Sequence, residues 1–456
     1  MSKTSTGWLI AGYLLLRWVL ATDPGYIYDV LAYKRWALAA ADFGISGVYA
    51  NSDFDYPPLY AYYLYPLGKI YKLISPEAFA ARTDTTLLSV LIKFPPLLMD
   101  LAIAWILHRF SQGSRFLGWG RGMQPNPDQD SALEIDGPSR WVRWLPFLYL
   151  FNPAILFDGA YWGQPDSIHS FFVLAAFLSF GWSRRAVLPW VLLTLATLMK
   201  PLGAPFFPLL AVLSIARFGL RSSILGGVAS AATVALVFLP FALAGNVGET
   251  LERITGDVGL MAYTSTNAHN VWWALGGWRD AEAPWLGPVT PTQLSLVLFA
   301  LFYLAILGKG HLLHRREESG INHPQMLGLT FLVGFGFFML ATHMHENHLF
   351  ITIPLALPLI LVPGAVGKQF RWVFLAVTVG VLLNLVLHDL YLPDRAPLTW
   401  GGPSGVENVH MDRPFAVFEL WAIRFSLWWN LALFGFVTVT GLKPNGWLDR
   451  LRSAAN

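Results

Sequence analysis

Acidic and aromatic residues that could carry chemistry are concentrated between Tyr26 and Tyr65. Within this stretch, Asp29, Tyr33 and Trp36 are spaced i, i+4 and i+7, which places their side chains on one face of a short helix. A carboxylate on such a face could accept a proton from a reacting hydroxyl group. An alternative for these residues alone is an interfacial helix on which Asp29 is only solvated.

The same stretch continues with Asp55 and Tyr56 directly before Pro57 and Pro58. Each proline restricts the residue before it to extended backbone, so this segment is stiff. Further candidate residues lie in short polar runs later in the chain. They are Trp162, Gln164 and Asp166 in YWGQPD, Lys200 in MKP, Asn267, His269 and Trp272 in NAHNVW, and His345 and Glu346 in HMHEN.

Two of these runs have competing interpretations. Lys200 ends an apolar run, and an ionisable group at a membrane boundary is a candidate for binding phosphate, although it could equally be a snorkelling lysine. The histidines around Glu346 do not have the HExxH spacing of a zinc enzyme, and the chain contains no cysteine. We therefore expect structural or phosphate-facing histidines here, and we predict neither a metal nor another cofactor.

Composition sets the class of protein that must position these residues. Apolar residues make up 55% of the chain and charged residues 13%, about half the charged fraction of a soluble domain. The mean hydropathy is +0.49, which indicates an integral membrane protein in contact with the lipid bilayer. A net charge of only +3 argues against nucleic acid as a partner.

Apolar runs of the length needed to cross a bilayer predict an all-α polytopic membrane protein with about twelve spans. The predicted spans are 7–22, 85–108, 144–160, 166–182, 186–199, 202–216, 223–244, 291–308, 324–342, 347–364, 372–388 and 415–441. Lys and Arg fall mainly in alternate short loops, which predicts that the N-terminus is cytoplasmic. The chain would then form a single transmembrane domain, 1–456, with a helical first exoplasmic loop at 23–84, a cytoplasmic linker at 109–143 and exoplasmic loops at 245–290 and 389–414.

Short motifs in a fixed order carry a family resemblance. They are Tyr28-Asp29, Arg35-Trp36-Ala37, Asp55-Tyr56-Pro57-Pro58-Leu59-Tyr60, Lys93-Phe94-Pro95-Pro96 followed by Asp100, Asn152-Pro153, Trp162-Gly163-Gln164-Pro165-Asp166, Met199-Lys200-Pro201, Asn267-Ala268-His269-Asn270-Val271-Trp272 and His343-Met344-His345-Glu346-Asn347. In this order the chain resembles the GT-C superfamily of polyprenyl-phosphate-sugar-dependent glycosyltransferases. It is similar to bacterial mannosyl- and glucosyltransferases and to their eukaryotic relatives that use dolichyl-phosphate glucose to extend lipid-linked N-glycan precursors.

The resemblance implies inverting transfer of a hexose, mannose or glucose, from a polyprenyl-phosphate donor to a hydroxyl of a glycan or glycolipid acceptor. It implies that Asp29 is the general base, with Asp55 in support and Asp23 as the competitor. The residues expected to bind the donor phosphate are Lys200, His345 and His269. Those expected to bind the substrates are Tyr56, Trp162, Gln164, Asp166, Asn267, Trp272 and Glu346. One departure is His343, because bacterial relatives often have arginine before Met-His-Glu.

Two other functions remain open at this point. A multi-pass transporter or lipid flippase would share the spans, but here the polar residues gather in outer loops rather than at mid-membrane. A surface-glycan polymerase or ligase would differ only in using a lipid pyrophosphate donor. We expect the protein in a bacterial or archaeal cell membrane, or in the endoplasmic reticulum membrane of a eukaryote, with its active site on the exoplasmic face.

Overall fold

Helices make up nearly all of the regular structure, as the sequence predicts. The computed structural model describes residues 3–111, 140–256, 263–277, 279–316, 323–391 and 416–451. The chain folds as two compact units, 1–257 and 258–456, each described separately below. Most of the predicted linker at 109–143 and of the predicted loop at 389–414 lies outside the described residues.

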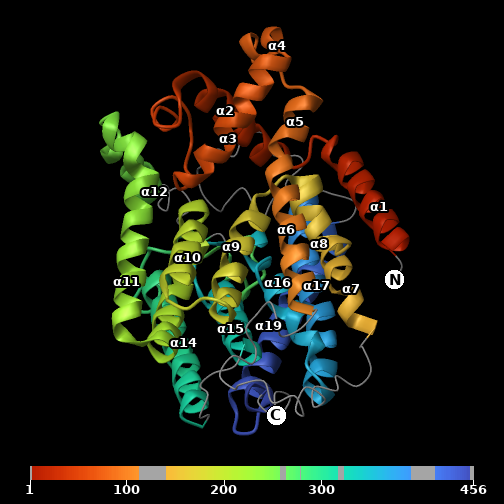
Figure 1. The fold of residues 1–456 in the computed structure, drawn as a ribbon, viewed down its shortest axis with the longest axis vertical. Helices are drawn as coiled ribbons and strands as arrows, with labels where there is room; N and C mark the ends of the chain where they lie inside the picture. The colour runs from red at the N-terminus through yellow and green to blue at the C-terminus, as the bar shows by residue number, and fades with distance from the viewer. Residues whose placement is uncertain are drawn as a thin grey trace. The chain divides into compact units, whose positions relative to one another are not determined.

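Among its described residues, the first unit contains fourteen helical segments and a π-helical segment, η1. In chain order they are α1 (Lys3–Ala21), α2 (Ile27–Phe43), α3 (Leu59–Ile74), α4 (Pro76–Ala80), α5 (Thr86–Ile92), α6 (Phe94–Ser111), α7 (Arg140–Leu150), α8 (Pro153–Ile155), η1 (Leu156–Trp162), α9 (Asp166–Leu178), η2 (Ser179–Gly181), α10 (Val187–Met199), η3 (Pro201–Phe206), α11 (Phe207–Leu243) and α12 (Val247–Gly256). Figure 1 shows α2, α3, α4 and α5 gathered at one end of this unit, beyond the ends of α9 and α10.

The second unit is also helical, apart from one pair of two-residue strands among its described residues. Its elements are β1 (Ser265–Thr266), α13 (Val271–Ala274), α14 (Pro291–Arg316), α15 (His323–Leu340), β2 (Met344–His345), η4 (Glu346–Leu349), α16 (Thr352–Ala356), η5 (Leu357–Leu361), α17 (Gly364–Tyr391), α19 (Ala416–Leu442) and α20 (Trp447–Arg450). The strands β1 and β2 are parallel, with Ser265 opposite Met344 and Thr266 opposite His345.

Six helical stretches in the described part of the chain are long and apolar enough to cross a bilayer. They are Thr86–Ser111, Pro201–Leu243, Pro291–Arg315, His323–Leu340, Gly364–Leu387 and Trp421–Leu442. Four shorter apolar helices occupy Ser5–Ala21, Asp166–Gly181, Val187–Met199 and Glu346–Leu361. These helices support an all-α, multi-pass membrane protein, whereas the count of twelve spans stays a prediction.

The long stretch that contains α11 is interrupted at Gly219. This residue has a φ of +80°, in the left-handed region that favours glycine. The Trp190 ring contacts both sides of the interruption: its Nε1 donates to Ser214 Oγ at 3.1 Å, and a Cβ placed on Gly226 would lie 2.5 Å from its Cδ1. Twelve residues of straight helix would span about 18 Å, so the chain must fold back at Gly219. This agrees with the prediction of separate helices at 202–216 and 223–244.

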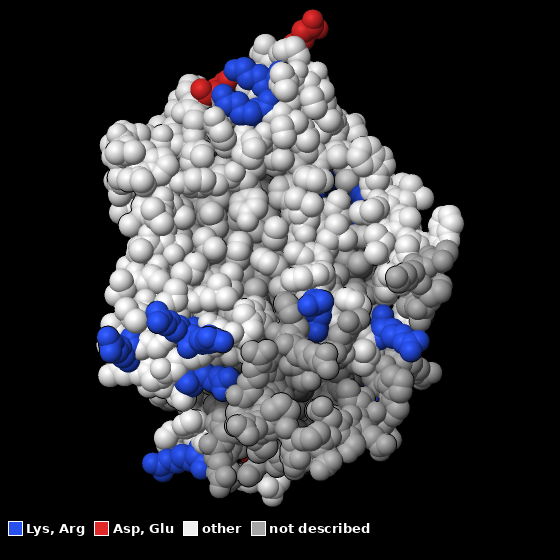
Figure 2. All heavy atoms as spheres, viewed as in Figure 1, with Lys and Arg blue, Asp and Glu red and all other residues white. Residues whose placement is uncertain are grey.

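Large apolar side chains are exposed along the surface of α11. Among them, Leu236 is 68% exposed, Leu220 61% and Val228 60%. Figure 2 shows a face of the molecule on which most atoms belong to uncharged residues. A surface of this kind favours contact with lipid rather than with water.

The packing of α2 against α3 fixes the helix that carries Asp29. A Cβ placed on Gly68 of α3 would lie 2.1 Å from the Ala37 carbonyl oxygen, so only glycine permits this close approach. Buried rings of Tyr33, Trp36 and Tyr60 fill the interface. The predicted helical face of Asp29, Tyr33 and Trp36 is therefore confirmed as part of α2.

Candidate active site

Asp29 lies in the first turn of α2 and is held by two donors from a distant part of the chain. Its Oδ2 accepts hydrogen bonds from Trp162 Nε1 at 2.8 Å and from Gln164 Nε2 at 2.6 Å. Among the described residues, no hydrogen bond reaches Oδ1, and the side chain keeps part of its surface exposed. One carboxylate oxygen is thus fixed in place while the other is open to a ligand.

The orientation of the Gln164 amide follows from its neighbours. Its Oε1 accepts a hydrogen bond from the Tyr33 hydroxyl at 3.0 Å, so its Nε2 must face Asp29. The Tyr33 hydroxyl also lies 3.2 Å from that of Tyr56. Burial raises the pKa of Tyr33 and of Tyr56 well above their ordinary value, so both phenols stay protonated at neutral pH.

The π-helix η1 and the turn after it present Trp162 and Gln164 to Asp29. Gly163 ends η1 with a φ of +92°, and a Cβ there would lie 3.2 Å from Val30 Cγ2 on α2. The Trp162 ring packs on Tyr26, with 4.7 Å between ring centroids. Single-turn π-helices are rare and occur often at functional sites.

Lys93 ties the segment before α2 to the end of η1. Its Nζ donates to the backbone carbonyl oxygens of Asp23 and Tyr161, each at 2.7 Å, and the residue is only 2% exposed. Gly25, with a φ of +73°, leaves room for this contact, since a Cβ there would lie 2.3 Å from the Tyr161 carbonyl oxygen. Lys93 therefore positions both halves of the Asp29 site through the backbone.

A buried ion pair lies beside these groups. Lys200 Nζ donates to Asp166 Oδ1 at 2.6 Å, and the two residues are 5% and 1% exposed. The same ammonium lies 5.9 Å from the centroid of the Tyr56 ring, whose hydroxyl is 3.5 Å from Gln164 Oε1. The structure thus brings together six of the predicted site residues, namely Asp29, Tyr56, Trp162, Gln164, Asp166 and Lys200.

The surroundings of Asp29 change its acidity. Burial raises its pKa to about 6, against the opposing effects of the Trp162 hydrogen bond and the positive charge of Lys200. A carboxylate with a pKa just below neutral is a stronger base than an ordinary aspartate and is still ionised at pH 7. Asp29 therefore has both the geometry and the basicity of a general base.

The two other predicted acids occupy different surroundings. Asp55 is exposed, although its charge is close enough to raise the pKa of Tyr49 and Tyr56 further above the effect of burial. Asp23 is also exposed, and its Oδ1 accepts a hydrogen bond from the Gly25 backbone N–H at 2.8 Å. Asp23 thus stabilises the turn before α2, and Asp29 is the better positioned of the two carboxylates to accept a proton.

The remaining predicted residues belong to the second unit. His269 is 2% exposed, and its Nδ1 lies 2.7 Å from Ser426 Oγ while its backbone N–H donates to Asn384 Oδ1 at 2.9 Å. Burial lowers the pKa of His269 to about 3, so its ring is neutral and offers a hydrogen bond rather than a positive charge. Trp272 is 1% exposed and donates to the Leu340 carbonyl oxygen at 2.8 Å.

Asn267, His345 and Glu346 meet at the strand pair of this unit. Asn267, with a φ of +57°, forms an isolated bridge with His345, and the backbone N–H of His345 donates to His348 Nδ1 at 3.2 Å. Glu346 is 3% exposed and begins η4. Within the described residues, no three His, Asp or Glu side chains converge as a metal site would require. Substrate and phosphate binding by these second-unit residues stays a prediction.

Tyr33, Lys93 and Asp100 received no functional role from the sequence alone. Asp100 is fully buried in α6, pairs with Arg17 at 3.1 Å and accepts hydrogen bonds from Tyr149 at 2.9 Å and from Ser167. Asp100 and Arg17 each lie within a predicted span, which is itself a signal of a constrained or functional residue.

Neither a scan against protein-family models nor a search of curated proteins finds a match to this chain.

Proposed function

We propose that this multi-pass membrane protein is an inverting glycosyltransferase that moves a hexose from a polyprenyl-phosphate donor to a hydroxyl of a glycan or glycolipid acceptor. The observation that carries the proposal is the state of Asp29, which has one oxygen fixed by Trp162 and Gln164 and the other open. The order of the sequence motifs supports the same reaction.

In the proposed reaction the acceptor oxygen attacks the anomeric carbon from the side opposite the phosphate. The new C–O bond forms as the bond between the anomeric carbon and the phosphate oxygen breaks, and the electron pair leaves with the lipid phosphate. Asp29 Oδ1 takes the proton of the acceptor hydroxyl. The reaction consumes no redox equivalent, and its second product is the free polyprenyl phosphate.

Lys200 is the cation best suited to stabilise the departing phosphate. An ammonium group has three N–H donors, and Asp166 takes one of them. Preorganised charge of this kind lowers the barrier when negative charge develops on a leaving group. Since the leaving group is a lipid monophosphate rather than a nucleotide diphosphate, we expect transfer to continue in the presence of a chelator. Loss of turnover that one divalent ion restores would contradict this expectation.

The test of the proposed function is release of free polyprenyl phosphate by the purified protein. A panel of radiolabelled polyprenyl-phosphate mannose and polyprenyl-phosphate glucose donors is incubated with membrane glycolipid extract. We expect one donor to yield both a labelled glycolipid and free lipid phosphate. If the protein binds these lipids but consumes none of them, a transporter or flippase is the better account. Consumption of only a lipid pyrophosphate donor would indicate the polymerase or ligase.

A further inference from the structure

A cavity of about 600 Å³ opens on the side of α2 that faces away from Asp29. Leu31, Lys34, Arg35 and Leu38 line it from α2, at the i, i+3, i+4 and i+7 spacing of a single helical face. Each residue advances a helix by about 100°, so this face lies on the opposite side of α2 from Asp29, Tyr33 and Trp36. One face of α2 thus carries Asp29, and the opposite face lines this cavity. The cavity volume is in the range of small-molecule pockets.

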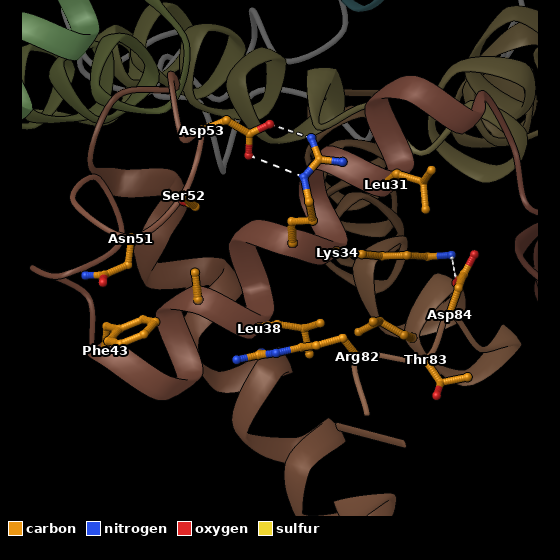
Figure 3. A pocket seen from close by; sticks show the side chains of 13 residues that line it. Leu31, Lys34, Leu38, Phe43, Asn51, Ser52, Asp53, Arg82, Thr83 and Asp84 are labelled. Atoms are coloured by element: carbon orange, nitrogen blue, oxygen red, sulfur yellow. Dashed lines mark hydrogen bonds and ion pairs between the residues drawn. The ribbon is translucent and has the colours of Figure 1, made fainter. Parts of the chain in front are cut away.

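Each of the three cations that line this cavity has a carboxylate partner. Lys34 pairs with Asp84, Arg35 with Asp53 and Arg82 with Asp42. Figure 3 shows Lys34 reaching Asp84 on one side of the cavity, with Asp53, Ser52 and Asn51 on the other. An anionic ligand would be repelled by these carboxylates as well as attracted by the cations, whereas a neutral ligand can accept hydrogen bonds from the cations and donate to the carboxylates. The cavity thus favours a ligand without net charge.

The remaining lining combines hydrogen-bonding groups with apolar surface. Asn51, Ser52 and Thr83 supply amide and hydroxyl groups, and the paired carboxylates keep further lone pairs for hydroxyl donors. The Phe43 ring, which is 52% exposed, offers flat apolar contact, and Leu38 adds to the apolar lining. Hydrogen-bonding groups together with an exposed ring match the hydroxyl groups and the C–H face of a sugar.

We propose that this cavity binds a neutral saccharide. One hydrogen bond joins it to the Asp29 face, since Trp36 Nε1 donates to Asp53 Oδ1 at 2.9 Å. Trp36 in turn packs on Tyr33 and Tyr56, with ring centroids 5.3 Å and 5.4 Å apart. If the proposed function holds, on which this further assignment rests, the saccharide is a part of the acceptor glycan remote from the reacting hydroxyl.

The experiment measures binding without turnover. Maltotriose and an α-linked mannotriose are each titrated against the full-length protein in detergent, and binding is followed by saturation-transfer difference NMR. We expect saturable binding of at least one trisaccharide. The Ser52→Trp variant fills the cavity and Phe43→Ala removes the exposed ring, so each should weaken binding by about tenfold or more.

Two control variants should bind the trisaccharide as the wild type does. Phe94→Ala removes an aromatic side chain of similar exposure, 45%, outside the cavity, and Asp29→Asn alters only the opposite face of α2. Binding of neither sugar, or binding that Ser52→Trp leaves unchanged, would overturn the proposal. So would binding of inorganic phosphate or dihexanoylphosphatidylethanolamine in place of the sugars.

The outcomes separate this proposal from the proposed function. Sugar binding with no consumption of any lipid donor supports the saccharide cavity and counts against the transferase. Donor consumption with no trisaccharide binding supports the transferase and counts against the saccharide cavity. Sugar transfer lost in Asp29→Asn while trisaccharide binding persists supports both.

Discussion

Gln164 Nε2 lies 2.6 Å from Asp29 Oδ2, and Oε1 of the same amide accepts a hydrogen bond from Tyr33 at 3.0 Å. One side chain thus links a carboxylate on α2 with a phenol one helical turn later on the same face. Asp29 Oδ2 is held by this contact, whereas Oδ1 accepts no hydrogen bond from the described residues.

The pKa of Asp29 predicts how the reaction depends on pH. A general base must be ionised, and burial raises the pKa of this carboxyl to about 6. We expect kcat/KM to be constant near pH 7.5 and to fall about tenfold for each pH unit below about 6. A pH series of initial rates checks this. We call this fall in kcat/KM below about pH 6 the acidic limb, and the Asp23→Asn variant should keep it at the same pH. An acidic limb near pH 4 in the wild type would contradict the assignment of Asp29 as the base.

A substitution at Gln164 should move that acidic limb. Gln164→Glu places a second carboxylate beside Asp29, and two such neighbours cannot both ionise easily. We expect the limb to move to higher pH, so that the rate at pH 7 falls by about tenfold or more. The rate should recover at alkaline pH, which a purely structural defect would not show. Gln164→Met is the matched variant without the added charge, and its limb should move less.

Lys93 is expected to contribute stability rather than chemistry. In Lys93→Met, the carbonyl oxygens of Asp23 and Tyr161 both lose a buried donor. The free energy of unfolding should fall by about 1–3 kcal/mol. Thermal unfolding in detergent measures this, with Lys34→Met as the control, since Lys34 pairs with an Asp84 that is 54% exposed. Equal melting temperatures for the two variants would argue against a stabilising role of the hydrogen bonds from Lys93 to Asp23 and Tyr161.

The Lys200–Asp166 pair can be tested for a role beyond stability. Lys200→Met alone leaves a buried carboxylate unpaired and should destabilise the protein by about 3–5 kcal/mol. The double variant Lys200→Met/Asp166→Leu removes both charges and should restore most of that stability. If Lys200 contacts the donor phosphate, the double variant will have an affinity for the lipid-phosphate donor that is lower by roughly tenfold or more, although its stability is restored. Wild-type donor affinity in the double variant would show that the pair is only structural.

Local pattern was enough to predict the helix that carries the candidate base. The spacing of Asp29, Tyr33 and Trp36 has the helical period, and α2 presents them on one face, where Tyr33 and Trp36 are buried and Asp29 is partly buried. The apolar runs likewise predicted an all-α membrane protein, because bilayer thickness sets helix length. Two of the predicted spans, 202–216 and 223–244, correspond to the helices on either side of Gly219.

Contacts between distant segments could not be predicted in the same way. Trp162 and Gln164 reach Asp29 across 133 and 135 residues, and the tertiary packing of η1, which includes contacts with α1 and α6, brings them there. The motif order grouped these residues without indicating which atoms meet. The pairing of Lys200 with Asp166 and the hydrogen bonds from Lys93 to two backbone carbonyls also depend on burial. The periodicity of one sequence does not encode which polar groups become buried together.

The most direct test of Asp29 as the general base is sugar transfer by three proteins, the wild type, Asp29→Asn and Asp23→Asn, at pH 7.5 with the lipid-phosphate donor that the wild type consumes. We expect Asp23→Asn to transfer at close to the wild-type rate, while Asp29→Asn loses at least about 100-fold in kcat and keeps its donor affinity. Full activity in Asp29→Asn, or its loss in Asp23→Asn alone, would contradict the assignment of Asp29 as the base.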